Sequence, residues 1–412
     1  MAETRLRLLT VVALLTLLAS SVLFTAAGVL QTAEQPTSWL LSAAAWTIGM
    51  TAVMLVTVPA PSGTRLSLGI GAVVAASILI ADPIALGASV SIALAASWLI
   101  QRNFHIGTVR TDGDLLADSL AMAVYVGVFL LAFDAFEMRF ELDASWTAVT
   151  AISVAGFAWF VVRAVVEAFV GLERTDLAGR YLWLLALEDW AVVVSMFAAG
   201  TLFGLTWPVM GLWSLAVAVL PYAFGHLAFA RYHSTRVTYG QTIRALAQIP
   251  EVAGLAPRGH ATRTSDLAVA VAQELGLHPK DVTELEYAAL MHDVGRITLN
   301  EPAILKAGFT DEDIARWGAQ IIAEAPYLEH VGELVEQQHR PYRSPGIEID
   351  PDVPISSKII KVSSAYDEGH HEMGLSPVEA LEKIHQGSAY EFDPAIAASL
   401  RRVLVFRGEI PY

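Results

Sequence analysis

The chain has 412 residues, of which 55% are hydrophobic and only 16% are charged. A soluble protein cannot bury that much apolar surface, so a large part of the chain is expected to face lipid. The net charge of −15 argues against a nucleic-acid partner, and the lack of cysteine excludes disulfides, thiolate metal sites and a cysteine nucleophile. Any metal must therefore be held by histidine and carboxylate side chains.

The composition changes sharply near residue 230. Residues 1–230 contain nine arginines, no lysine and fifteen carboxylates, whereas residues 231–412 contain seventeen basic and twenty-six acidic residues. We therefore predict an all-α chain in three parts: a transmembrane helix bundle over 1–230, a linker helix over 231–250 and an all-helical cytoplasmic domain over 251–412.

The first part contains eight apolar runs near the length of a membrane-spanning helix, about 20 residues. They lie at roughly 8–31, 38–59, 66–82, 84–101, 115–136, 146–170, 181–204 and 208–230. The third and fourth runs are short and are expected to form a tight hairpin or a re-entrant pair. The first run follows two arginines as a signal peptide does, but its length and the seven later runs favour an uncleaved anchor.

The arginines predict the orientation of the bundle. With eight spans, one side receives nine of them: Arg5, Arg7, Arg65, Arg102, Arg110, Arg174, Arg180, Arg231 and Arg236. The other side receives only Arg139, which has acidic neighbours. The positive-inside rule then places both termini in the cytoplasm of a multi-pass protein of the inner or plasma membrane.

Some charged residues fall inside the predicted spans. Arg163 and Glu167 are one turn apart on the sixth span, and Glu188 and Asp189 lie on the seventh. Arg163 and Glu188 are at equal depth if the two spans are antiparallel, so we predict an intramembrane pair of Arg163 with Glu188 or Asp189. Such a pair is either a structural clamp or a site that senses a ligand or a proton.

The cytoplasmic part has helical periodicity throughout. One helix begins near His260 and repeats apolar residues at i, i+4 and i+8, namely Leu267, Val271 and Leu275. The next begins at Pro279 and places four residues on one face: Leu285, Ala288, Ala289 and His292.

The segment "AALMHDVGRITL" ends this second helix with the dipeptide His292–Asp293. A histidine nitrogen and a carboxylate oxygen suit a divalent cation such as zinc, manganese or iron, and His260 could supply a third ligand. Such a cation would neutralise charge on a phosphoryl oxygen. From the spacing by itself, polar residues at a helix end are the favoured interpretation.

Four segments, in order from about Thr242 to Val405, resemble the HD superfamily of metal-dependent phosphohydrolases and its HD-GYP branch. They are "GHATRTSDLAVAVAQELGL", "LMHDVGRI", "VPISSKIIKVSSAYD" and "LSPVEALEKIHQGSAYEFDPAIAASL". The resemblance implies hydrolysis of a phosphodiester, most often cyclic di-GMP, on two or three metal ions. It also implies that His260, His292 and Asp293 are metal ligands and that Arg296 replaces a family lysine that binds phosphate.

The chain also departs from the family pattern. The histidine expected between "TDEDIAR" and Gly318 is absent, the paired histidines become Gln338–His339, and "RPYRSPG" replaces the Gly-Tyr-Pro loop. Ser364 stands in place of the late aspartate ligand, with Asp367 one helical turn away. Four ligands remain, His260, His292, Asp293 and His339, which predict a single divalent ion.

Other polar residues near these segments have two interpretations. His330, His370 and His371 either replace a lost ligand or are solvated, and we favour the second. Arg340 and Arg343 either bind a substrate phosphate or solvate their loop.

The leading prediction is a membrane-anchored HD-type phosphohydrolase acting on a nucleotide or cyclic dinucleotide, with Asp293 and Arg296 as catalytic residues. The alternative is a catalytically silent HD-GYP-like domain that binds a nucleotide or a protein partner and relays a membrane signal. A transporter built on the intramembrane charges is a weaker third, because the sequence has no inverted repeat or broken-helix signature. The expected partners are the lipid bilayer and a small nucleotide, and a second copy of the chain in a homodimer is a further candidate.

Overall fold

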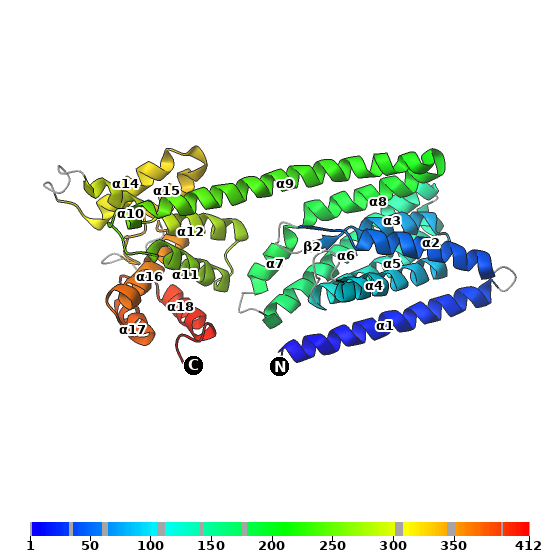
Figure 1. Cartoon of the computed structure of the whole chain (residues 1–412), viewed down its shortest axis with the longest axis horizontal. Helices are drawn as coiled ribbons and strands as arrows, with labels where there is room; N and C mark the ends of the chain where they lie inside the picture. Colours follow the sequence, from blue (N-terminus) through cyan, green and yellow to red (C-terminus); the bar gives the residue numbers. More distant parts are fainter. Residues whose placement is uncertain are drawn as a thin grey trace. The chain divides into compact units, whose positions relative to one another are not determined.

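The structure is a computed structural model. It describes residues 2–32, 36–59, 65–104, 112–140, 143–174, 179–300, 308–343, 352–388 and 390–411. The chain divides into two compact units, one of residues 1–175 and 182–231 and the other of residues 176–181 and 232–412. Helices dominate both units, which confirms the predicted all-α class for the described residues (Figure 1).

The first unit, which we call the membrane unit after its candidate membrane spans, is built from long apolar helices and one short pair of antiparallel strands. Its elements are α1 (Ala2–Gln31), α2 (Pro36–Met54), β1 (Thr57–Pro59), β2 (Arg65–Ser67), α3 (Gly69–Leu79), α4 (Pro83–Phe104), α5 (Asp112–Phe140), α6 (Ala144–Arg174), α7 (Gly179–Leu187), α8 (Trp190–Met210) and η1 (Gly211–Trp213). The antiparallel pair of β1 and β2 was not predicted. It joins α2 to α3, with Val58 opposite Leu66.

Five segments of the described residues are long and apolar enough to cross a membrane. They are Thr10–Gln31, Pro83–Asn103, Leu116–Arg139, Ala144–Leu172 and Gly179–Leu220. The predicted count of eight spans is not confirmed. One reason is α3, whose 11 residues cover only about 16 Å, roughly half the thickness of a bilayer core.

The predicted span at 181–204 lies within the candidate segment Gly179–Leu220, but it is not one unbroken helix. The helix stops at Leu187, and α8 starts at Trp190 after a turn at Glu188 and Asp189. The next interruption comes at Gly211, whose φ of +55° favours glycine, and not at residues 205–207. Apolar composition therefore marked the right region but not the helix ends within it.

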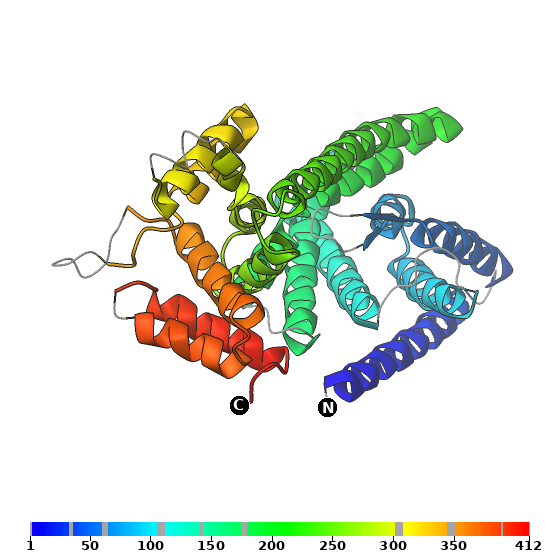
Figure 2. The same ribbon diagram turned by 60° about the vertical axis from the view of Figure 1, so that its left-hand side comes forward.

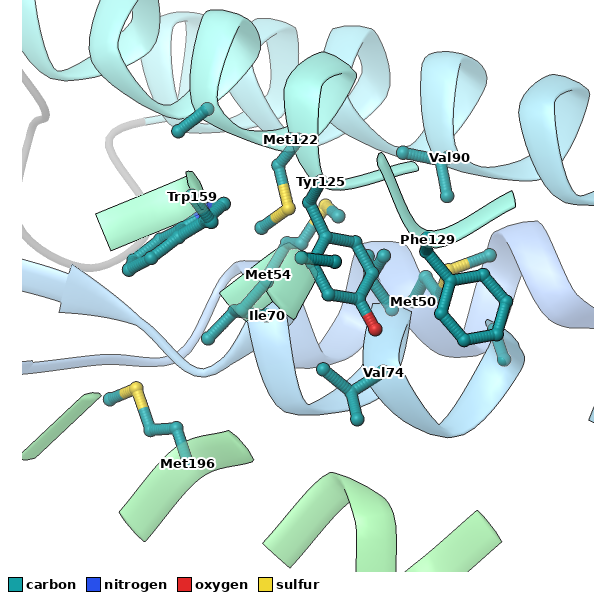
Figure 3. Close-up of a cluster of buried hydrophobic side chains, with 14 of the residues drawn as sticks. Met50, Met54, Ile70, Val74, Val90, Met122, Tyr125, Phe129, Trp159 and Met196 are labelled. Atoms are coloured by element: carbon teal, nitrogen blue, oxygen red, sulfur yellow. The ribbon is translucent and has the colours of Figure 1, made fainter. Parts of the chain in front are cut away.

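A cluster of large apolar side chains holds the membrane unit together (Figure 3). Tyr125 and Phe129 of α5 and Trp159 of α6 belong to this cluster, and the Tyr125 and Trp159 rings each lie 5.7 Å from that of Phe197 on α8. Helices α5 and α6 pack side by side. Helices α3 and α8 approach so closely that a Cβ atom on Gly200 would lie 2.3 Å from the Gly71 carbonyl oxygen. Close approach at small residues is typical of membrane helix pairs.

Helix α9 (Ser214–Ala247) is one continuous helix of 34 residues (Figure 1). It includes most of the segment predicted as a linker helix, 231–250. The short α10 (Ile249–Val252) follows, with Pro250 in its first turn, a position that proline tolerates.

The second unit continues with short amphipathic helices. They are α11 (His260–Glu274), α12 (Pro279–Met291), η2 (Val294–Asn300), α14 (Asp311–Ala323), η3 (Pro326–Leu328), α15 (Glu329–Glu336), α16 (Ile355–Asp367), η4 (Glu368–Glu372), α17 (Pro377–Gly387) and α18 (Pro394–Phe406). Capping boxes at Thr310 and Ser376 begin α14 and α17. Helix α11 packs against α12, α16 and α18, and Figure 2 shows α17 and α18 beside α16. This packing brings the ends of three helices to one place.

Candidate metal centre

Two helix ends supply the residues of the His-Asp motif. His260 is the first residue of α11, directly after Gly259, whose φ of +76° suits glycine. His292 ends α12, and Asp293 follows it before η2. The glycine of the motif has a packing role, because a Cβ atom on Gly295 would lie 2.0 Å from the Ile314 carbonyl oxygen of α14.

The three side chains converge on one buried point. The Nε2 atoms of His260 and His292 are 3.2 Å apart. The Oδ2 atom of Asp293 lies 3.9 Å from the first and 3.7 Å from the second. All three residues are buried, and one ligand atom from each lies within 4.8 Å of the others. Two imidazole nitrogens and a carboxylate oxygen form a donor set that suits a transition metal.

The Oδ2 atom of Asp293 shows that these residues fit a cation. It is buried and has no hydrogen-bond partner. A buried carboxylate oxygen without a partner is costly, and a cation between the three groups would satisfy it.

The backbone fixes the orientation of the His292 ring. Its Nδ1 donates a hydrogen bond of 2.8 Å to the Ala289 carbonyl oxygen, so the Nε2 side faces the cluster. The side-chain Nε2 of Gln338 donates to the His292 carbonyl oxygen at 2.9 Å. Gln338, which stands where the resemblance expects a histidine, is thus buried beside the site and supports it.

The two imidazoles differ in their electrostatic environment. Burial by itself lowers the pKa of His260, but the hydrogen bond with Asp367 and the charge of Asp293 outweigh it and raise that pKa. Burial lowers the pKa of His292. The Nδ1 contacts of the two rings, with Asp367 and with the Ala289 carbonyl oxygen, leave their Nε2 atoms facing each other.

Asp293 is held as a carboxylate. Burial alone would raise its pKa, but His292 and Arg296 hold the pKa below its usual value. The Nε of Arg296 donates to Asp293 Oδ1 at 2.6 Å, which leaves Oδ2 toward the histidines. Arg296 is about one third exposed, so it links the buried carboxylate to solvent.

Ser364 lies beside the cluster where the resemblance expects an aspartate. Its Oγ is 3.4 Å from His260 Nε2 and 3.5 Å from His292 Nε2. It also donates to Glu368 Oε1 at 3.3 Å. Asp367, one turn away, contacts the opposite edge of His260, with 2.7 Å between its Oδ2 and the Nδ1 of His260.

The fourth predicted ligand, His339, is not in the group of three. Its side chain is half-buried, and burial lowers its pKa. Lys361 Nζ donates to the carbonyl oxygens of His339 and Arg340, at 2.8 Å and 3.0 Å. The guanidinium of Arg343 lies 5.5 Å from the Tyr390 ring. The structure therefore places this loop close to α16 without bringing its side chains into the cluster.

The remaining predicted histidines make contacts of their own outside the cluster. His330 Nδ1 is 2.9 Å from Glu333, and His370 Nδ1 donates to the Leu375 carbonyl oxygen at 2.7 Å. His371 Nδ1 lies 2.9 Å from Asp367 Oδ1. Asp367 also contacts His260 and Arg263, which lie 107 and 104 residues away in the sequence, so sequence reasoning missed this network.

Arg163 of α6 has partners that were only partly predicted. Arg163 donates to Asp118 of α5 and to Glu167, one turn away on α6. Asp189 is buried and acts electrostatically on Arg163. The pairing of Arg163 with Glu188 stays a prediction. Depth along the spans predicted Glu188 or Asp189 as the partner of Arg163, and it did not identify Asp118.

Comparisons with known proteins place this cluster in a family context. The sequence model of the HD domain family matches residues 258–369, which contain His260, His292 and Asp293. Residues 258–369 are therefore an HD domain. The chain is 25% identical over 139 residues to a cyclic di-GMP phosphodiesterase of Thermotoga maritima. It is 27% identical over 139 residues to the cyclic di-GMP phosphodiesterase response regulator RpfG of Xanthomonas campestris.

Each alignment covers 31% of this chain and 37–38% of the relative, so the chain spans well under half the length of either protein. No solved structure matches the chain. The homology supports the predicted HD superfamily and its HD-GYP type, and the family-model match lies within the second unit.

Proposed function

We propose that the chain is a membrane-anchored, metal-dependent phosphohydrolase that cleaves a phosphodiester in a nucleotide or cyclic dinucleotide. The observation that carries the proposal is the buried group of His260, His292 and Asp293, with Asp293 Oδ2 lacking a partner. The HD domain and the two cyclic di-GMP phosphodiesterases support the reaction class.

Each residue has a role in this proposal. His260 and His292 present Nε2 lone pairs, and Asp293 adds a negative charge through Oδ2. His339 is the proposed fourth ligand, by rotation of its half-buried ring. One manganese, iron or zinc ion held there would act as a Lewis acid on a phosphoryl oxygen.

Arginines supply the contacts to the substrate. Arg296 is anchored through Nε by Asp293, so the other end of its guanidinium is directed to an anionic phosphate at the edge of the site. Arg340 and Arg343 are proposed as weaker contacts of the same substrate.

The decisive experiment measures metal and hydrolysis together. We expect the full-length protein, purified in detergent, to retain about one equivalent of transition metal, in keeping with a three- or four-ligand site. It should hydrolyse cyclic di-GMP slowly when manganese or iron is supplied. Asp293→Ala should lose both properties, whereas Asp281→Ala, an exposed change on the same α12, should keep them. Wild-type protein that binds no metal and cleaves no cyclic dinucleotide would rule out the enzyme.

A silent relay domain is the second candidate, and Ser364 favours it. A hydroxyl 3.4–3.5 Å from both Nε2 atoms adds no charge where the resemblance expects an aspartate. The same experiment separates the two candidates. The relay predicts that cyclic di-GMP binds without being hydrolysed in the presence of either metal.

A further inference from the structure

Asp367 is the most heavily bonded carboxylate near the metal centre. Its Oδ2 accepts from His260 Nδ1 at 2.7 Å and from Arg263 at 2.9 Å. Its Oδ1 accepts from Arg263 Nε at 2.6 Å and lies 2.9 Å from His371 Nδ1. A carboxylate offers about four acceptor positions, so these contacts use its capacity.

This saturation argues against Asp367 as a metal ligand. A ligand needs a free lone pair directed at the ion, and Arg263 grips both oxygens in a bidentate pair. Asp367 also lies at the Nδ1 edge of His260, whereas the metal group forms at the Nε2 edge. It is one turn from Ser364 on α16, but it faces a different side of the imidazole.

We infer that Asp367, clamped by Arg263, is a positioning residue that holds the His260 ring with its Nε2 toward the metal centre. The inference rests on the proposed function only in taking His260 as a ligand. An anionic acceptor at Nδ1 forces the proton onto that nitrogen and leaves Nε2 as the donor atom for the ion. It also increases the basicity of the imidazole.

Arg263 gives the arrangement its rigidity. It lies one turn after His260 on α11, so one helix carries both the ligand and the cation that fixes the positioning residue. Its guanidinium also donates to the Arg258 carbonyl oxygen at 3.0 Å, which ties it to the loop before α11. The clamp thus joins α11 to α16, which contact each other directly.

The test is a cobalt titration of full-length protein in detergent, followed by visible absorption and by competition with a chelator. Asp367→Asn should weaken cobalt affinity about 10- to 100-fold, the usual effect of losing a partner of a metal-bound histidine. At saturating cobalt the band positions should equal those of wild type, because the ligands themselves are unchanged.

Two further variants keep the test informative if Asp367→Asn folds poorly. Arg263→Gln should also lower the affinity, because it leaves Asp367 in place without its clamp. His371→Ala is the matched control. The exposed His371 contacts Asp367 and makes no contact with His260 among the described residues. The cobalt affinity of this variant should stay within about twofold of wild type, far from the loss expected when a positioning partner is removed.

The outcomes are distinct from those of the phosphohydrolase test. Wild-type affinity in both Asp367→Asn and Arg263→Gln would overturn the positioning role even if the protein hydrolyses cyclic di-GMP. Shifted cobalt bands in saturated Asp367→Asn would overturn it in favour of direct ligation. Wild-type protein that binds no cobalt would overturn both proposals. Weakened binding without any hydrolysis would support positioning and reject the enzyme.

Discussion

Two groups of charged side chains are buried, one in each unit, and they differ in how fully their charges are paired. In the membrane unit, the Arg163 guanidinium donates hydrogen bonds to two carboxylates, those of Asp118 and Glu167. In the HD domain, Arg296 contacts only one oxygen of Asp293 and leaves Oδ2 buried without a partner. A group in which every charge is paired (a closed group) stabilises a fold. A group that leaves one carboxylate oxygen unpaired beside two imidazoles (an open group) is suited to bind an ion.

The largest expected effect comes from breaking the closed group. Arg163→Ala would leave Asp118 and Glu167 buried without their cation, which typically costs about 3–5 kcal/mol. We expect a large fall in the thermal unfolding temperature of the full-length protein in detergent, whereas Arg139→Ala, an exposed change, should have little effect.

Double variants identify which carboxylate matters. Adding Asp118→Ala to Arg163→Ala should recover part of the lost stability, because no buried charge of that pair remains. The same cycle with Glu188→Ala tests the pairing predicted from depth. If Asp118 and Arg163 proved strictly additive, the structural clamp would be refuted.

The contrast between these two groups also shows how far the sequence alone could lead. Periodicity located α11 and α12, since Leu267, Val271 and Leu285 are all buried as their spacing requires. It also placed His260 and His292 at helix ends, and the resemblance linked them to Asp293. These predictions depend only on the spacing of residues that are close in the sequence, which a helix keeps when the chain folds.

The parts that failed depend on geometry that sequence does not encode locally. Asp118 and Arg163 are 45 residues apart, and their contact depends on how α5 and α6 are rotated about their axes. The link from Arg263 to Asp367 spans 104 residues. The turn at Glu188 was hidden because hydropathy averaged over a span tolerates two charged residues between apolar neighbours.

A smaller effect is expected when the open group loses its arginine. Arg296→Gln removes a hydrogen bond to a charged acceptor, which is worth roughly 1.5–3 kcal/mol. Unlike Arg163→Ala, the loss should be partly reversed by adding zinc or cobalt, because an ion bound to the folded state raises its stability. Thermal unfolding with and without metal measures this. A loss that metal does not reduce would contradict the open character of the site.

The smallest effect concerns an ion pair near the surface of the second unit, which gives a baseline for both buried groups. Arg402 and Ser399 of α18 donate to Glu274 at the end of α11. Burial alone would raise the pKa of Glu274, but these hydrogen bonds outweigh it and lower the pKa below its usual 4.5. A lowered pKa in the folded state means that the carboxylate stabilises the domain fully above its unfolded pKa. This contribution is lost as the pH falls through the folded pKa of Glu274.

Glu274→Gln should therefore cost about 0.2–1 kcal/mol at pH 7, and the difference from wild type should shrink below roughly pH 4.5. Hydrogen exchange of α11 and α18 amides at both pH values measures it, with the exposed Glu382→Gln as control. A difference that grew on acidification would mean that the folded state raises the pKa of Glu274, and the assigned role of Arg402 would be wrong.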